Sequence, residues 1–166
     1  MPTTASDLFV TRISTSDDVI EQLVPFLNIQ LANATTAQLQ IKFAHWNVKG
    51  EGFFPAHKLF DEIYELVQEQ TDDIGERITA LGGVAEGLPE QVAKATDLPE
   101  YGSGPKELVQ THMESMADLV GFLSNEYRTG IALSGKLGDL VTQDLFLKMA
   151  GELDRKLYFL EAHLRP

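Results

Sequence analysis

The 166-residue sequence contains no cysteine, which excludes disulfide bonds, thiolate metal ligands and thiol redox chemistry. Any metal ion must therefore be held by oxygen and imidazole nitrogen atoms. The sequence also lacks a run of 18 or more apolar residues, and no basic segment with an apolar stretch suggests a secretory signal. We therefore expect no membrane span and place the protein in the cytoplasm.

Basic residues are scarce, with 13 Lys and Arg against 25 Asp and Glu, so the formal net charge is −12. Such a chain attracts cations and repels nucleic acid. The length of 166 residues predicts a single domain with a substantial core. Residues 1–17 show no helical period and are rich in Ser and Thr, which indicates an N-terminal arm before a domain of residues 18–166.

Apolar residues at helical spacing predict four long helices in the rest of the chain. The first starts near Ser16, Asp17 and Asp18, and Pro25 requires that it begin close before the proline or be kinked there. Its inward-facing stripe runs through Leu27, Leu31, Ala34, Gln38, Ile41, His45 and Val48. The second starts near Pro55 and stops at Gly82-Gly83, with the stripe Phe60, Ile63, Val67, Ile74, Ile78 and Leu81.

A long connection of residues 83–105 follows, with a short helix expected around residues 90–95. It is long enough to cross the bundle, so the third helix can run parallel to the second. Residues 130–138 are expected to hold the end of the third helix and the next turn, and Asp139 caps the last helix. This order predicts an all-α, ferritin-like four-helix bundle with a long crossover, carrying a short helix, between helices two and three. The core stripes of the last two helices are Val109, Met113, Met116, Val120, Leu123 and Tyr127, then Phe146, Met149, Leu153, Leu157, Leu160 and Leu164.

One face of the second helix carries a set of metal-type ligands that fall within an arc of about 100°. They are His57, Asp61, Glu65, Asp72 and Glu76. A solvated edge of an amphipathic helix is the ordinary explanation of an acidic face, but such an edge usually mixes Lys and Arg into its i,i+4 pairs, and this one has none.

Asp61 and Asp72 lie about 16 Å apart along the helix axis, so one metal centre cannot use both ends. Either each chain carries two half-sites, or a second copy of the helix lies antiparallel and brings one chain's His57/Asp61 end against the other's Asp72/Glu76 end. A two-fold dimer produces the second arrangement.

The run His45-Trp46-Asn47-Val48-Lys49-Gly50, followed by His57-x-x-x-Asp61 and Asp72-x-x-x-Glu76, resembles the Dps family of mini-ferritins, over about residues 19–164. The resemblance implies a shell of twelve identical subunits that oxidises Fe(II), usually with hydrogen peroxide, and stores ferric mineral, which protects against oxidative stress. It further implies a ferroxidase centre of two iron ions, with three ligands from one subunit and two from its two-fold partner. Those ligands are His45, His57 and Asp61, then Asp72 and Glu76 of the second chain.

The same resemblance suggests further roles. An acidic pore would involve Asp139 and Asp144, although Asp139 is equally explained as a helix cap. Mineral nucleation would involve Glu62, Glu65 and Glu69, each of which is equally explained as a solvated acid. Trp46 lies beside the first ligand, where a packing role at the dimer interface is at least as good an interpretation. Zinc is a competing or resting metal, and neither His112 nor His163 is expected to be a primary ligand, although His163 could bind a second metal.

The name of the family refers to DNA binding, but we do not expect this chain to bind DNA. Affinity for DNA comes from clustered cations that displace counterions. Residues 1–17 contain only Arg12, the C-terminus offers only Arg165, and Arg155-Lys156 is the only adjacent basic pair. We predict weak or absent DNA binding.

Two functions remain to be separated. The first is a peroxide-consuming ferroxidase and iron store. The second is a binding protein, either a nucleoid-compacting shell with incidental iron chemistry or a bundle that holds zinc structurally. The scarcity of clustered cations argues against compaction, and an open oxygen and imidazole ligand set argues against a closed structural zinc site. The preferred oxidant and the resting metal stay open.

Overall fold

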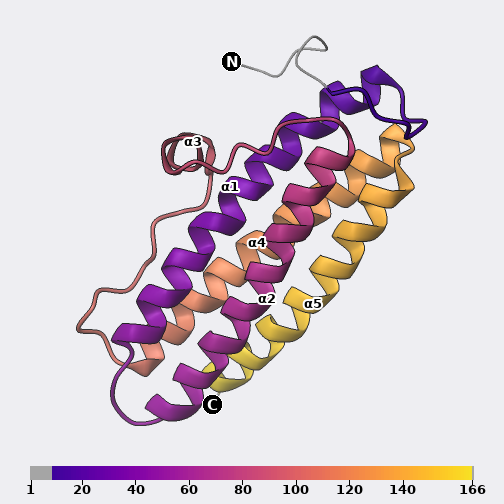
Figure 1. The fold of residues 1–166 in the computed structure, drawn as a ribbon. Helices are drawn as coiled ribbons and strands as arrows, with labels where there is room; N and C mark the ends of the chain where they lie inside the picture. The colour runs from indigo at the N-terminus through magenta and orange to yellow at the C-terminus, as the bar shows by residue number, and fades with distance from the viewer. Residues whose placement is uncertain (1–8, 166) are drawn as a thin grey trace.

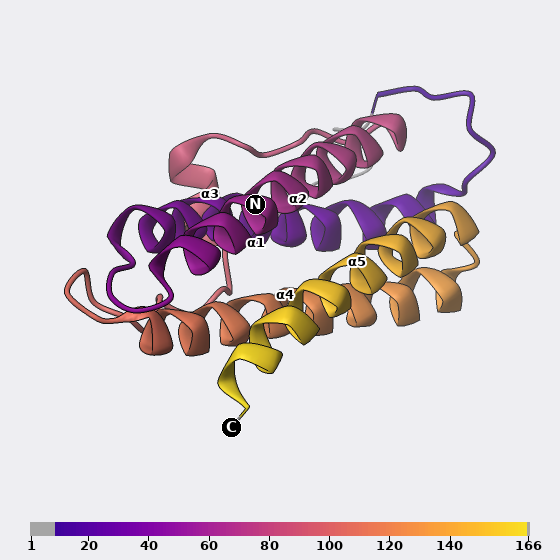
Figure 2. The same cartoon turned by 90° about the horizontal axis from the view of Figure 1, so that it is seen from below.

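The computed structural model describes residues 9–165 and shows four long helices in a bundle, with a short fifth helix outside it (Figure 1). The helices are α1 (Asp17–Asn47), α2 (Phe53–Ala80), α3 (Pro89–Ala95), α4 (Val109–Leu137) and α5 (Leu140–Leu164). α1 packs against α2 and α4 against α5, so the bundle has two layers (Figure 2). The predicted all-α, ferritin-like architecture is confirmed, including the short helix in the crossover.

The crossover of residues 81–108 returns the chain along the length of the bundle, and α2 and α4 consequently run in the same direction (Figure 1). α3 lies in this crossover and contacts α1. None of the helices in the described part of the chain is long and apolar enough to cross a membrane.

Two buried asparagines of α1 fix the crossover to the bundle. The Oδ1 atom of Asn33 accepts hydrogen bonds from three groups of residues 96–98, at 2.8 to 3.2 Å. Asn28 donates to the carbonyl oxygen of Val84 at 3.0 Å and accepts from the amide of Glu86 at 2.9 Å. Because a buried backbone N–H without a partner is costly, these side chains select the path of the crossover and hence the parallel orientation of α2 and α4.

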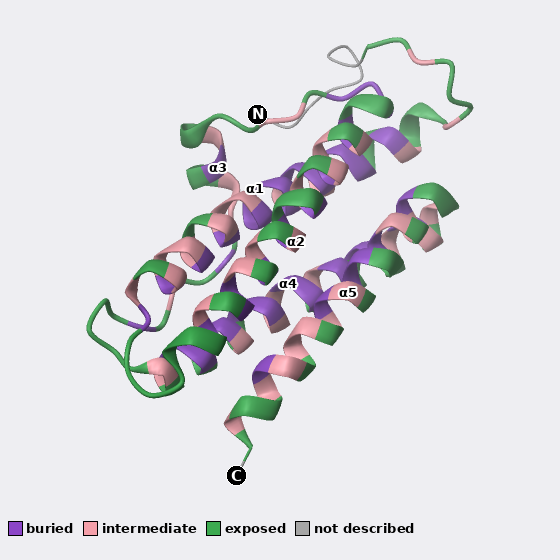
Figure 3. Ribbon diagram, turned by 60° about the horizontal axis from the view of Figure 1, so that its bottom comes forward, coloured by how far each residue is buried: buried purple, intermediate pink, exposed green. Residues whose placement is uncertain are grey.

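The apolar stripes of the four long helices meet in one core, which is seen as the buried inner faces in Figure 3. The largest fully buried side chains include Tyr127, Phe60 and Phe146. Most predicted stripe positions are buried. The exceptions, which are only partly buried, are Gln38, His45, Val109, Leu157 and Leu164. Helical spacing alone therefore identified most of the packing.

The end of α4 falls within residues 130–138, as predicted. α4 continues through Gly130 to Leu137, and the chain turns at Gly138, whose φ is +77°. Gly130 is required for another reason, since a Cβ atom there would lie 2.6 Å from the ring of Phe146 on α5. The glycine allows α5 to pack closely and does not end the helix.

Pro25 lies well inside α1, which begins eight residues earlier at Asp17 and continues as one helix to Asn47. The predicted start at Ser16 and Asp17 is confirmed, with Ser16 as the N-cap residue. A proline here removes one backbone hydrogen bond. The neighbouring side chains Val24 and Leu27 are fully buried, so core packing holds the helix across this position.

Only part of the predicted arm lies within the described residues, because residues 1–8 fall outside them. The amide of Phe9 donates to the carbonyl oxygen of Gly82 at 2.7 Å, directly after α2. Gly82 has a φ of +86°, and a Cβ atom there would collide with the carbonyl oxygen of Phe9. This glycine therefore makes room for the arm to cross the end of the bundle.

Candidate metal centre

Two histidines from neighbouring helices meet at the α1–α2 turn. His45 lies in the last turn of α1 and His57 in the second turn of α2. Their rings stack with centroids 3.7 Å apart. The turn that brings them together contains Gly50 and Gly52, both with positive φ, and Gly52 is the N-cap residue of α2.

Each histidine is held by the backbone of the other. The Nδ1 atom of His45 lies 3.0 Å from the carbonyl oxygen of His57, and the Nδ1 atom of His57 lies 2.9 Å from the carbonyl oxygen of His45. A carbonyl oxygen only accepts, so both Nδ1 atoms carry the hydrogen. In the neutral rings both Nε2 atoms then keep a lone pair, which is the form that binds a metal ion.

The surroundings also favour the neutral form of His45. Burial lowers the pKa of its imidazole, and the neighbouring His57 and Lys42 act in the same direction, against the hydrogen bond to the His57 carbonyl and the charge of Asp61. A lowered pKa means that His45 is uncharged at neutral pH. The lone pair on Nε2 is therefore available without first losing a proton.

The Asp61 carboxylate completes this end of α2. One of its oxygens, Oδ1, lies 3.8 Å from Nδ1 of His45 and accepts a 2.6 Å hydrogen bond from the ammonium group of Lys42. The hydrogen bond from Lys42 lowers the pKa of Asp61, with further contributions from the charge of Lys42 and the two histidines. Asp61 is therefore ionised at neutral pH and already has a cationic partner.

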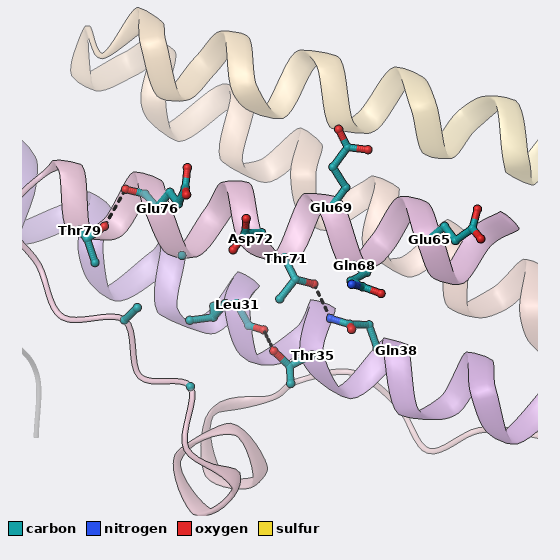
Figure 4. Close-up of a pocket in the computed structure, with 13 residues that line it drawn as sticks. Leu31, Thr35, Gln38, Glu65, Gln68, Glu69, Thr71, Asp72, Glu76 and Thr79 are labelled. Carbon is teal, nitrogen blue, oxygen red and sulfur yellow. Dashed lines mark hydrogen bonds between the residues drawn. The ribbon is translucent and has the colours of Figure 1, made fainter. Parts of the chain in front are cut away.

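The other acids of the stripe border a groove between α1 and α2, with a volume of about 860 Å³. Figure 4 shows Glu65, Glu69, Asp72 and Glu76 along α2, with Gln38 among the α1 residues of the facing wall. All four acids are exposed. Polar contacts tie the two walls together, since Gln38 donates to the hydroxyl of Thr71 at 2.8 Å.

One chain alone does not complete a metal site. α2 is a single helix from Phe53 to Ala80, so Asp61 and Asp72 remain separated by about 16 Å along its axis. Within residues 9–165, no three His, Asp or Glu side chains of this chain gather in a way that could hold a metal ion. The candidate ligands on α2 and at the α1–α2 turn therefore form two separate groups, one with His45, His57 and Asp61 and the other with Asp72 and Glu76.

Large apolar side chains next to the histidines in the sequence are exposed. Trp46, next to His45, is 70% exposed, and Phe54 is 64% exposed. The Phe53 ring lies 5.1 Å from the His57 ring. Exposed aromatic side chains beside polar groups are typical of a surface that another protein chain covers.

The two candidate pore residues differ in their environment. Asp139 is the N-cap residue of α5, as predicted, and its side chain is only 5% exposed. Its carboxylate accepts two hydrogen bonds from Arg77, at 3.0 and 2.7 Å, and one from the Thr142 hydroxyl at 2.7 Å. Asp144, one turn further along α5, is exposed. The Asp139 carboxylate thus has partners within its own chain.

The three candidate nucleation residues are all exposed, and they differ in their contacts. Glu62 accepts a 2.7 Å hydrogen bond from Lys156 of α5. Glu65 and Glu69 line the groove between α1 and α2. Cations therefore reach the acidic face from other helices, which the spacing along α2 alone did not reveal.

The two remaining histidines lie away from the His45–His57 pair. His112 is fully buried near the start of α4, where its Nδ1 atom lies 3.2 Å from the Tyr101 hydroxyl, and burial lowers its pKa. His163 is exposed near the C-terminus and its Nδ1 atom lies 2.7 Å from the carbonyl oxygen of Phe159. Both therefore make contacts only with nearby residues among those that the structure describes.

Sequence reasoning missed three cations that contact candidate acids, namely Lys42, Arg77 and Lys156. A signal existed for Lys42, because it precedes His45 by three residues and so lies on the same side of α1. Arg77 offered only its place in the last turn of α2, a position that usually reflects the helix dipole.

Comparisons with known proteins agree with the fold. A family model described as a ferritin-like domain matches residues 25–166. The chain is 34% identical over 145 residues to the DNA protection during starvation protein of Agrobacterium fabrum, covering 86% of this chain and 88% of the relative. The tetragonal form of Mycobacterium smegmatis Dps superposes with a TM-score of 0.89 at 32% identity, covering 95% of this chain and 94% of that chain. A zinc-soaked Dps from Listeria innocua superposes with a TM-score of 0.79 at 30% identity, covering 85% and 94%.

Proposed function

Because the chain belongs to the Dps family of ferritin-like proteins, we propose that it is a ferroxidase that oxidises Fe(II), preferably with hydrogen peroxide, and stores the ferric product inside a shell of twelve subunits. The observation that carries the proposal is the histidine pair. Both Nδ1 atoms are held by backbone carbonyl oxygens, so both Nε2 atoms keep the lone pair that binds a metal ion.

The centre is shared between two chains related by a two-fold axis. His45, His57 and Asp61 of one chain bind iron together with Asp72 and Glu76 of the second chain. When two copies of α2 lie antiparallel, the His57/Asp61 end of each copy lies against the Asp72/Glu76 end of the other. A two-fold contact produces this arrangement because it pairs the same two surfaces in both directions. The separation of the two groups along α2 and the exposed Trp46 and Phe54 support this arrangement.

The chemistry follows from the types of ligand. Carboxylates bind Fe(II) and Fe(III) and can bridge two ions, while neutral imidazole adds affinity for the divalent form. Two Fe(II) held side by side each give one electron to one peroxide molecule. The O–O bond then breaks into two hydroxide ions without release of a hydroxyl radical, and the carboxylates hold the ferric product before it moves to the mineral. Zinc suits the same ligands and is a competing metal.

Iron entry and storage use the other acids. Of the two pore candidates, Asp144 has the exposed carboxylate, whereas that of Asp139 is engaged by Arg77 and Thr142. We assign ion entry chiefly to Asp144 and a structural role to Asp139. Among Glu62, Glu65 and Glu69, the last two line the groove and are better placed for nucleation, because Glu62 is paired with Lys156.

The first measurement is the stoichiometry of oxidation. Fe(II) is loaded without oxygen, and one half-equivalent of peroxide is added while ferric absorbance and remaining peroxide are followed. We expect two Fe(II) oxidised per peroxide and no radical trapped. His45→Ala is expected to slow this reaction at least about tenfold, because a metal ligand is lost.

His163→Ala provides the matched control, since it removes an exposed histidine that bonds only to its own helix. It is expected to leave the rate unchanged. Slow oxidation with release of hydroxyl radical in the unaltered protein would contradict the proposal, and the structural zinc site would then be the better explanation.

We expect the proposed iron-storage shell not to bind DNA. The charge of −12 is multiplied in a shell, and the sequence of residues 1–17 contains no lysine. We expect no retardation of supercoiled DNA at neutral pH and physiological salt with micromolar protein and no divalent metal. Retention of the DNA in a gel-shift under these conditions would show that the prediction is wrong.

A further inference from the structure

Residues 99–108 form the last part of the crossover and lie over the start of α4, at the end of the bundle where α1 turns into α2 (Figure 1). Directly after this segment, the amide of Val109 donates to the carbonyl oxygen of Lys49 in the turn at 3.2 Å. Ser103 is buried, and its hydroxyl donates to the carbonyl oxygen of Thr111 at 2.8 Å. Polar contacts therefore fix the segment to α4 near the α1–α2 turn.

His112 on α4 is packed against the same segment. Its side chain is fully buried, and the Tyr101 ring is stacked on the imidazole with ring centroids 5.9 Å apart. Tyr101 also packs against the ring of Phe43 on α1, with centroids 5.7 Å apart. Tyr101 thus joins residues 99–108 to two helices of the bundle, and His112 is one of its partners.

The hydrogen bonds of Tyr101 define where His112 carries its hydrogen. The Tyr101 hydroxyl lies 3.2 Å from Nδ1 of His112 and 3.2 Å from the carbonyl oxygen of the same residue. A carbonyl oxygen only accepts, so both contacts are satisfied together when the hydroxyl donates to the carbonyl and Nδ1 carries a hydrogen. The other ring nitrogen, Nε2, then has a lone pair. Among the residues that the structure describes, Nε2 has no hydrogen-bond partner.

A proton on Nε2 is costly while the segment is in place. It adds an N–H group and a positive charge in a fully buried position, where no acceptor from residues 9–165 receives it. Burial accordingly lowers the pKa of the His112 imidazole. Of the charged groups around the ring, Lys49 in the turn acts in the same direction and Glu107 on the segment opposes it. His112 is therefore neutral at pH 7.

We propose that His112 is a pH-sensitive switch, whose protonation releases residues 99–108 from the end of the bundle. The inference is independent of the proposed function, because His112 is not among the ligands assigned there. Once the segment moves away, water reaches the ring, and its pKa returns to the ordinary value of about 6.5.

The released form therefore binds the proton more tightly than the closed form, which sets the direction of the pH dependence. The closed form has its full stability above about pH 6.5. As the pH falls below this value towards the lowered pKa of the closed form, the equilibrium constant for release rises by up to about tenfold per pH unit.

Hydrogen exchange measured by mass spectrometry on the assembled protein tests the switch. The exchange of each peptide is compared at about pH 7.5 and about pH 5, after correction for the intrinsic effect of pH on exchange. We expect the protection of residues 99–112 to fall by about tenfold at the lower pH, and that of residues 116–127 in the middle of α4 to stay the same. His112→Phe keeps a ring in the buried position and cannot take up a proton, so it is expected to abolish this loss.

His163→Phe is the matched control, because it makes the same substitution at an exposed histidine. It is expected to keep the full loss of protection at low pH. If His112→Phe does not assemble, His112→Asn, which also cannot be protonated, is measured in its place with the same expected result.

Equal protection of residues 99–112 at both pH values in the unaltered protein would overturn the inference. So would an unchanged loss in His112→Phe, because other titrating groups would then be responsible. A loss of protection shared equally by all the helices would also overturn it, since acid would then destabilise the whole bundle.

Discussion

Shells made only of Asp72→Asn, Glu76→Gln subunits are expected to assemble normally and to lose Fe(II) oxidation by peroxide. Both residues are exposed, and the amides match the acids in size, so neither folding nor packing changes. The loss follows because amides bind iron weakly and carry no negative charge. A second variant, His57→Ala, Asp61→Asn, is expected to be equally inactive, since it removes ligands from the other group.

Co-assembly of the two inactive variants separates a shared centre from two half-sites within one chain. At a two-fold contact between one chain of each kind, one of the two centres regains all its ligands and the other loses every altered group. With random pairing, half of the contacts are mixed, and about a quarter of the full activity is expected to return.

Shells that are assembled separately and then mixed provide the control and are expected to stay inactive. Size-exclusion chromatography with light scattering checks that every preparation has the same oligomeric state. If co-assembled shells remain as inactive as the separate ones, the centre is not shared between chains, and the arrangement of one chain's His57 against the other's Glu76 is wrong.

Local chemistry was enough to predict most of the fold. Helix ends at Ser16, near Pro55 and at Asp139 follow from side chains that act within a few residues, namely N-caps and a proline in a first turn. The long stretch after Gly83 predicted the crossover because no helical period continues through it. These features depend on sequence neighbours, and the structure contains them as expected.

Features that depend on contacts between helices could not be predicted in the same way. Gly130 lies inside α4, where its lack of a side chain admits the Phe146 ring of α5, and nothing in the sequence indicated this contact. Pro25 was expected either close after a helix start or at a kink, and α1 begins eight residues before it and extends on both sides of it. In both cases packing against another helix outweighs the local preference of the residue.

The candidate centre shows the same division. The spacing of Asp61 and Asp72 was enough to argue that one end of α2 cannot complete the site. The reciprocal hydrogen bonds of His45 and His57 depend on how α1 and α2 pack at their turn, which no period within one helix determines. Lys42 was overlooked for the same reason, since it reaches Asp61 from the neighbouring helix.

Arg77→Met is expected to destabilise the fold by about 3 to 5 kcal/mol, because it leaves the buried carboxylate of Asp139 without its cation. The Arg77 and Asp139 side chains are only 10% and 5% exposed, and their closest N–O distance is 2.7 Å. Arg77 also donates to the Thr142 hydroxyl at 2.8 Å, so the network joins the last turn of α2 to the start of α5. Thermal unfolding at fixed protein concentration measures the loss.

Arg128→Met is the matched control, because it removes the cation from another Arg–Asp pair. Arg128 and Asp154 join α4 to α5 at 2.6 Å, but their side chains are 49% and 44% exposed. Exposed ion pairs contribute at most about 1 kcal/mol, so this variant is expected to lose far less stability. Equal losses in both variants would mean that the burial of the Arg77–Asp139 pair has no special cost.

The pH dependence of the stability loss in Arg77→Met tests whether the charge of Asp139 causes that loss. Burial alone would raise the pKa of this carboxyl group, but the hydrogen bonds from Thr142 and Arg77 hold it below its ordinary value. A lowered pKa stabilises the fold above the pKa of the unfolded chain, and this stabilisation is lost as the pH falls through the folded pKa. Without Arg77 the pKa rises, and Asp139 takes up a proton in the folded state as the pH falls.

The difference in stability between the unaltered protein and Arg77→Met is therefore expected to be largest at neutral pH and to shrink below about pH 4. Adding Asp139→Asn to Arg77→Met removes the unpaired charge and keeps a good N-cap residue, so it is expected to restore part of the stability at neutral pH. The loss of stability in Arg77→Met could instead be the same at neutral pH and at low pH, with no stability restored by Asp139→Asn. Packing of the Arg77 side chain, and not its charge, would then stabilise the junction of α2 and α5.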